Sequence, residues 1–135
     1  MKYLWIIIAL MGFVSVVRAD THLSIADLSA DGQKVQDMDC HLSKGGMFAL
    51  MQIVGDLAKQ KSSMDACAPE GMAIRLQWNL GGDKKIQTLS SSNPDKNACV
   101  VAALSKTSFS DQGHCSAIIL VGDAAQAKQK TTQLK

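Results

Sequence analysis

The sequence is poor in the residues and motifs on which several large function classes depend. Aromatic residues make up only 4% of it, and proline occurs twice. After residue 18, no stretch combines a strong basic charge with interleaved aromatics, which argues against nucleic acid as a partner. A glycine-rich phosphate loop and a Gly-x-Ser-x-Gly elbow are also missing. The nucleotide-binding and serine-hydrolase classes therefore have no support.

The three histidines have no partners in the sequence that would make them catalytic. His22, His41 and His114 lack an obvious serine or cysteine with an orienting carboxylate. Paired carboxylates beside an aromatic stretch, which would suggest a glycosidase, do not occur either. We therefore expect a protein that is not an enzyme, with no catalytic residues and no cofactor.

Long apolar runs are absent except at the N-terminus. Lys2 precedes an almost unbroken apolar run from Tyr3 to Val17, and Val17-Arg18-Ala19 offers small residues at the two positions that a signal peptidase reads. The run is about 15 residues long, short of the ~20 that cross a bilayer. We predict a cleaved signal peptide over residues 1–19 and a periplasmic or secreted mature protein; the alternative is an uncleaved N-terminal anchor.

The mature chain has no excess of either charge. Loss of the signal peptide removes Lys2 and Arg18 and leaves 12 basic residues against 12 acidic ones. This balance gives no support for binding to anionic lipid, and we expect no stable membrane insertion after cleavage. Residues 124–135 are polar and mildly basic, and they predict a solvated, flexible tail that is either frayed or weakly helical.

Four cysteines remain in the mature chain: Cys40, Cys67, Cys99 and Cys115. An even number in an exported domain of this size predicts two disulfides, and four cysteines allow three pairings. No C-x-x-C spacing occurs, which argues against a thioredoxin-type site and a zinc ribbon. The cysteine positions alone leave all three pairings open.

The first half of the mature chain predicts an arm followed by a helix. Residues 20–46 are polar with scattered apolar side chains and no clear period, which indicates an N-terminal arm. From Met47 to about Lys61, apolar residues recur at helical spacing. The methionines of this stripe favour core packing, with a groove that binds a ligand or a partner as the alternative.

The second half predicts two strands, a helix and a third strand. Side chains alternate from Met72 to Leu80, and Gly81-Gly82-Asp83 predicts a hairpin turn into a strand over 84–90. Asn93-Pro94 predicts the start of a helix that ends near Ser108, and a last strand follows over 115–121. The expected fold class is α+β, over residues 47–123: a small three-stranded antiparallel sheet with helices on one face, in the order α-β-β-α-β.

Four short stretches between residues 71 and 121 match one known family. Gly71 to Trp78 looks like its first strand, Leu80-Gly81-Gly82-Asp83 like its glycine turn, Ser90-Ser91-Ser92 like the end of its second strand, and Cys99-Val100 with Phe109 like its helix. The segment thus resembles the TonB C-terminal-like family, in its AgmX-type branch. Ser110 stands where that family usually has proline, and the long proline-rich linker of TonB proper is missing. The energy-transducing role of TonB therefore does not carry over.

The fold that this resemblance implies also fixes the cysteines. It places Cys67 and Cys99 at one end of the sheet and Cys40 and Cys115 at the other, which implies the bridges Cys67–Cys99 and Cys40–Cys115. The same pairing brings Cys40-His41 beside His114-Cys115. Two Cys-His pairs are a possible copper or zinc site, but that site needs reduced thiols, which an oxidising compartment disfavours. We therefore expect surface histidines beside a disulfide and no metal.

These observations together predict an exported, non-enzymatic protein-interaction or adaptor module of the bacterial cell envelope. We expect an envelope or secreted protein as partner, bound through a free sheet edge or through the face near Trp78, with Arg75 and Gln77 beside it. The core is the alternative place for Trp78. A secreted inhibitor of a cell-wall hydrolase or similar enzyme is the alternative function.

Overall fold

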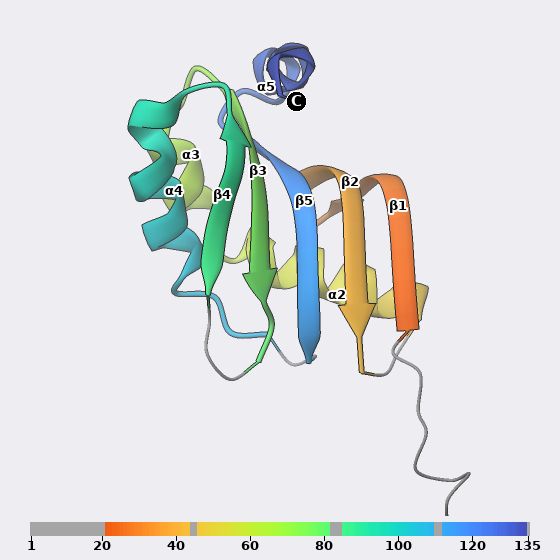
Figure 1. Cartoon of the computed structure of the whole chain (residues 1–135). Coiled ribbons are helices and arrows are strands. Elements are labelled where there is room, and N and C mark those ends of the chain that lie inside the picture. The colour runs from red at the N-terminus through yellow and green to blue at the C-terminus, as the bar shows by residue number, and fades with distance from the viewer. Residues whose placement is uncertain (1–20, 44–45, 82–84, 110–111, 135) are drawn as a thin grey trace, which may run out of the picture.

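The computed structural model describes residues 21–43, 46–81, 85–109 and 112–134. It has an α+β fold with a single antiparallel sheet (Figure 1). One face of the sheet is covered by the helices α2 (Met47–Ala58), α3 (Lys61–Cys67) and α4 (Asn97–Leu104), and α5 (Ala124–Lys130) lies across one end of the other face. The predicted signal peptide lies outside the described residues. None of the helices within the described ranges is long and apolar enough to cross a membrane.

The sheet has five strands rather than the three predicted. They are β1 (Thr21–Ala30), β2 (Gln33–Leu42), β3 (Met72–Asn79), β4 (Ile86–Ser91) and β5 (Gly113–Val121). Their order across the sheet is β1-β2-β5-β3-β4, and every neighbouring pair is antiparallel. The predicted β3, β4 and β5 are present, and β3 pairs with both of the others, as the TonB-like arrangement implies.

The two additional strands come from the segment that was predicted to be an arm. Asp31 and Gly32 join β1 to β2, and both have positive φ angles of 51° and 85°. Two central residues with positive φ make the tight turn that suits a two-residue hairpin, and Asp-Gly favours it. β2 then pairs with β5, so the hairpin extends the sheet instead of projecting from it.

Three helices on one face form the main core with the sheet. α2 (Met47–Ala58) buries Leu50, Ile53, Val54 and Leu57, which confirms the predicted helix. α3 (Lys61–Cys67) follows it, and α4 (Asn97–Leu104) comes after a 3-10 turn over Pro94–Lys96. The methionine stripe of α2 is only partly core, because Met47 and Met51 remain about half exposed.

The C-terminal tail, predicted to be flexible and either frayed or weakly helical, contains a short helix that packs on the sheet. Its residues form α5 (Ala124–Lys130) and a 3-10 turn over Thr131–Gln133. A small second core joins Ala127 and Leu134 to Ala73, Ile118 and Leu120 of the sheet. The outward side chains of β3 and β5 are apolar at this end, and α5 removes them from water.

Both disulfides have the pairing that the TonB-like fold implies. Cys40–Cys115 joins β2 to β5 with a Cα–Cα distance of 4.1 Å, and Cys67–Cys99 joins α3 to α4 at 5.8 Å. Both distances lie below the limit of about 7 Å for a bridge.

Candidate functional site

The face of the sheet opposite α2, α3 and α4 is only partly covered. α5 packs on the end that holds Ala73 and Leu120. At the other end, polar side chains of four neighbouring strands point to the same side, because alternate residues of a strand share a face. We call this region the open face; its members are His22, Ser24, Asp39, His41, Gln77, Asn79, His114 and Ser116.

The three histidines form one row across the open face. Strand register pairs His22 with His41 and His41 with His114, so that β1, β2 and β5 each contribute one ring. The His22 and His41 rings stack with centroids 4.2 Å apart and an interplanar angle of 4°. The His41 and His114 rings follow at 4.9 Å and 21°. We call His22, His41 and His114 the histidine row.

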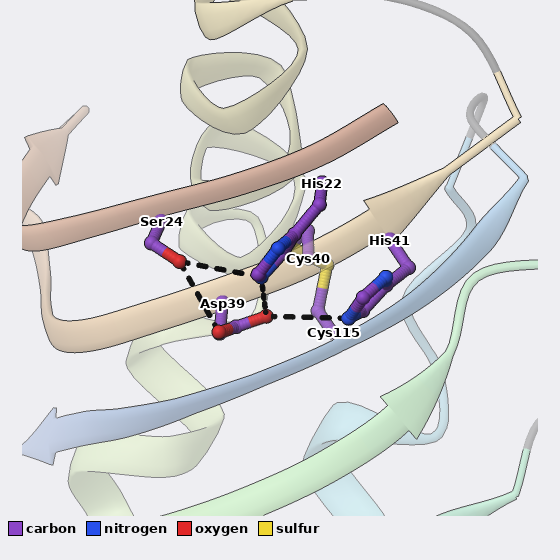
Figure 2. The surroundings of a disulfide bond; sticks show 6 residues. All are labelled: His22, Ser24, Asp39, Cys40, His41 and Cys115. Carbon is purple, nitrogen blue, oxygen red and sulfur yellow. Dashed lines mark hydrogen bonds and ion pairs between the residues drawn. A yellow bond between two sulfur atoms is a disulfide. The ribbon is translucent and has the colours of Figure 1, made fainter. Parts of the chain in front are cut away.

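Asp39 lies beside this row and contacts two of its members. Its Oδ1 is 2.9 Å from His22 Nε2 and 3.7 Å from His41 Nε2, and Ser24 Oγ donates to Oδ2 at 3.1 Å (Figure 2). The pKa of the Asp39 carboxyl is lowered, first because His22 donates a hydrogen bond to it. Burial opposes this effect, whereas Ser24 and the charge of His41 add to it. Asp39 is therefore an ionised acceptor, and His22 Nε2 carries the donated proton.

Ser24, His22 and Asp39 resemble a catalytic triad in composition but not in geometry. Ser24 Oγ lies 3.5 Å from His22 Nε2, the same ring nitrogen that contacts Asp39. In a serine nucleophile, one ring nitrogen takes the hydroxyl proton while the other donates to the carboxylate. These three side chains therefore cannot relay a proton from serine to histidine in this arrangement.

The Cys40–Cys115 disulfide lies directly beneath the histidine row. Cys40 separates Asp39 from His41 in sequence, and Cys115 follows His114. Both cysteines are fully buried on the helix side of the sheet, and their neighbours project from the open face (Figure 2). The bridge therefore fixes β2 to β5 at the point where they carry the polar cluster.

The three residues predicted for binding divide between the two faces. Trp78 is 1% exposed and packs in the main core, which is the alternative place predicted for it. Gln77 belongs to the open face, and Arg75, two residues earlier on β3, projects from the same side of the sheet. The Arg75 guanidinium lies 3.6 Å from the Asp37 carboxylate, and Gln77 borders a shallow hollow of about 210 Å³ with Asp39, His41 and His114.

Sequence reasoning missed the contribution of β1 to this face. His41 and His114 were considered as metal ligands because they adjoin cysteines, but His22, Ser24 and Asp39 were not placed beside them. The available signal was the alternation of His22 and Ser24 with Leu23 and Ile25, together with the Asp-Gly turn.

A larger hollow of about 440 Å³ lies at the other end of this face, between the hairpin and α5. Asp27, Lys34, Gln36, Leu120 and Lys128 contribute to its lining. It contains both charge signs and no histidine or cysteine. Among the described residues, the side chains that lie close enough together to hold a metal ion are His22, Asp39 and His41. No protein-family model, curated protein or solved structure matches this chain.

Proposed function

We propose that this protein is an exported, non-enzymatic interaction module of the bacterial cell envelope whose partner adds an extended segment to the free edge of β1. The observation that carries this proposal is the edge itself: β1 runs for ten residues and, among the residues that the structure describes, has β2 as its only strand neighbour. An unpaired edge offers a row of backbone donors and acceptors to a peptide. The resemblance of residues 71–121 to TonB C-terminal-like domains supports the envelope setting.

The register identifies which backbone groups of β1 face the partner. The 4.1 Å Cα–Cα distance of Cys40 and Cys115 is typical of a pair that does not exchange backbone hydrogen bonds. Cys40 therefore directs its N–H and C=O toward β1, where Leu23 is its partner. Because these directions alternate along a strand, His22 and Ser24 present their backbone groups to the free edge.

This edge lacks the usual protection against pairing. β1 contains neither lysine nor proline, and Asp27 is its only carboxylate. Its inward side chains Leu23, Ile25 and Leu28 pack on the core but remain partly exposed. An added strand with apolar residues at alternate positions would complete their burial.

The first two turns of α2 add an apolar surface next to this edge. Met47, Phe48 and Met51 are 49%, 86% and 47% exposed, and the N-terminal end of α2 lies behind β1 (Figure 1). Contiguous exposed apolar side chains often mark an interaction site. They extend the surface available to the inward side chains of an added strand.

Photo-crosslinking in the exporting cell tests the proposal. A photoreactive residue at Ala26 places the probe on the β1 edge, and one at Gln87 of β4 is the matched control, because both positions are exposed edge-strand sites. We expect Ala26 to crosslink to a component of a membrane-associated envelope machine and Gln87 not to. Crosslinks confined to Gln87 would contradict strand addition at β1. A soluble cell-wall hydrolase captured at Ala26 would favour the inhibitor function instead.

Backbone hydrogen exchange with the captured partner supplies an independent measurement. We expect the exchange of the His22 and Ser24 amides to slow on binding, because both face the free edge. The Leu23 amide, which already faces β2, should change little. Equal protection of all three amides would indicate general rigidification rather than an added strand.

Export is tested separately by N-terminal sequencing of the protein recovered from the envelope fraction. We expect the mature chain to begin at Asp20. Recovery of full-length protein in the cytoplasm would refute the export proposal.

A further inference from the structure

We propose that His22, Asp39 and His41 form a binding site for a divalent transition-metal ion, which holds Cu(II) more tightly than Zn(II). One nitrogen or oxygen from each of the three side chains lies within 4.8 Å of the other two. This site does not depend on strand addition at β1, and it uses side chains where that proposal uses the backbone edge. It also replaces the Cys-His arrangement considered from sequence, because the cysteine sulfurs are oxidised and on the other face.

The donor set suits such an ion. Imidazole nitrogen binds zinc, copper, iron and nickel, and a carboxylate supplies the negative charge that offsets part of theirs. Asp39 directs Oδ1 toward both histidines, at 2.9 Å from His22 Nε2 and 3.7 Å from His41 Nε2. The metal ion takes the place of the proton that His22 Nε2 donates to Asp39, and this proton is released to solvent. Ser24 donates to the second oxygen, Oδ2, and so orients the carboxylate from outside the ligand set.

The backbone holds these donors on a rigid platform. Asp39 and His41 lie two residues apart on β2 and share a face, and His22 is the cross-strand neighbour of His41. The buried disulfide at Cys40, between the two β2 donors, ties this strand to β5. Fixed strand positions lower the ordering cost that the ligands pay when they converge on one ion.

The stacked rings define the rearrangement that binding requires. A metal ion bonds an imidazole nitrogen in the plane of its ring, so two rings that are parallel within 4° cannot share one ion without turning. The side chains of His22 and His41 are 54% and 42% exposed, which leaves them room to rotate. We therefore expect metal binding to unstack this pair while the β1–β2 register stays unchanged.

The order of affinities follows from the ligands and their exposure. For a given nitrogen and oxygen site, Cu(II) binds more tightly than the neighbouring divalent metals, including zinc. Three protein donors on an open face leave further coordination positions to water, which both ions accept. No feature of the cluster enforces the closed tetrahedral shell that structural zinc sites use.

Calorimetric titration of the mature protein with CuCl2 and with ZnCl2 near neutral pH tests the site. We expect one ion per chain. The affinity for the ion should fall at least about tenfold in Asp39→Asn and in His41→Ala, because the loss of an outer-shell partner alone typically lowers metal affinity by about tenfold or more. His114→Ala is the matched control, because it removes a ring from the same row outside the ligand group. Its affinity should stay close to that of the unchanged protein.

Electron paramagnetic resonance of the Cu(II) protein identifies the ligands directly. We expect nitrogen coupling from two imidazoles, reduced to one in His41→Ala. Far-ultraviolet circular dichroism and thermal unfolding of each variant show whether it is folded, and a folded Asp39→Asn that binds both ions unchanged would refute the proposal.

A second outcome would also overturn it. If the mature chain begins at Asp20, its α-amine stands two residues before His22, and such a terminus can chelate Cu(II) without Asp39 or His41. Copper affinity that survives both substitutions but is lost when one glycine is added before Asp20 would assign the ion to the terminus. N-terminal sequencing of the same sample establishes whether that amine is free, so this result stays separate from a failure of the export proposal.

Discussion

At the scale of single residues, Asp37 decides which side chains of β2 reach the open face. Before it, Gln33 and Val35 are buried; after it, Met38, Cys40 and Leu42 are buried. The φ angle of Asp37 is 49°, and the pairing with β5 shifts between Gln36 and Asp39. An uninterrupted strand would continue the first alternation and turn Asp39 and His41 into the core. The bulge therefore creates the candidate site.

Asp37→Val should weaken the bulge, whereas Asp37→Gly should keep it. A β-branched residue pays about 1–2 kcal/mol for left-handed backbone that glycine adopts freely. We expect the free energy of unfolding of Asp37→Val, measured by urea denaturation, to be about 1–2 kcal/mol lower than that of Asp37→Gly. Both variants lose the same ion pair with Arg75, so their difference isolates the backbone term. Equal stabilities would show that the bulge does not depend on residue 37.

This bulge also explains why the hairpin could not be predicted while the later strands could. From Met72 to Leu80 the alternation is uninterrupted, and it correctly gives β3 and its buried face. In β2 the phase changes at Asp37, so no period of two extends over the whole strand. The same break hides part of the candidate site. His41 and His114 stand out in the sequence because they adjoin cysteines, but His22 can be placed beside them only when the hairpin is known.

At the scale of elements, α5 shows how tertiary contacts order a segment that has little helical signal. Seven residues are too few for a stable isolated helix in water. Asp123 caps it by accepting a hydrogen bond from the Gln126 amide at 3.0 Å. Its sequence has no apolar stripe, and Ala127 is the only residue of the helix that is buried. The contacts with β3 and β5 therefore supply what the sequence of the helix lacks.

Ala127→Glu should release α5 from the sheet, and Ala125→Glu is its matched control. Both changes put the same side chain into the same helix, but Ala127 is fully buried whereas Ala125 is exposed. An unpaired carboxylate among Ala73, Ile118 and Leu120 cannot keep its hydration. We expect Ala127→Glu to speed proteolysis after Lys128 and Lys130 by trypsin, with Ala125→Glu unchanged. Equal cleavage of both variants would show that this contact does not hold the helix.

At the scale of the whole molecule, the two disulfides connect different parts of the fold. Cys40–Cys115 closes a chain separation of 75 residues and joins the N-terminal hairpin to the sheet. Cys67–Cys99 closes one of 32 residues and joins two helices on the covered face. With them, the hairpin, the helices and the sheet form a single cross-linked unit.

Removal of either bridge should lower the free energy of unfolding, and removal of Cys40–Cys115 should lower it more. Loop-closure entropy gives about 4.5 kcal/mol for the longer loop and about 3.7 kcal/mol for the shorter one. The paired variants Cys40→Ala/Cys115→Ala and Cys67→Ala/Cys99→Ala, compared by urea denaturation, measure this order. A larger loss for the Cys67–Cys99 pair would mean that native-state packing outweighs the chain entropy.

In the native protein, a reductant should open Cys67–Cys99 before Cys40–Cys115, although Cys67–Cys99 is the bridge expected to stabilise the fold less. Cys40 and Cys115 are both fully buried, whereas Cys99 is exposed on α4. Thiol-disulfide exchange requires a thiolate to reach a sulfur atom, so access controls the rate in the folded state. Under mild dithiothreitol treatment followed by alkylation and peptide mass spectrometry, we expect Cys67 and Cys99 to be labelled first. In urea both bridges should react at similar rates, because unfolding removes the difference in access. Early labelling of Cys40 and Cys115 in the native protein would instead show that the sheet opens beneath the histidine row, and would remove the rigid platform on which the metal-site proposal depends.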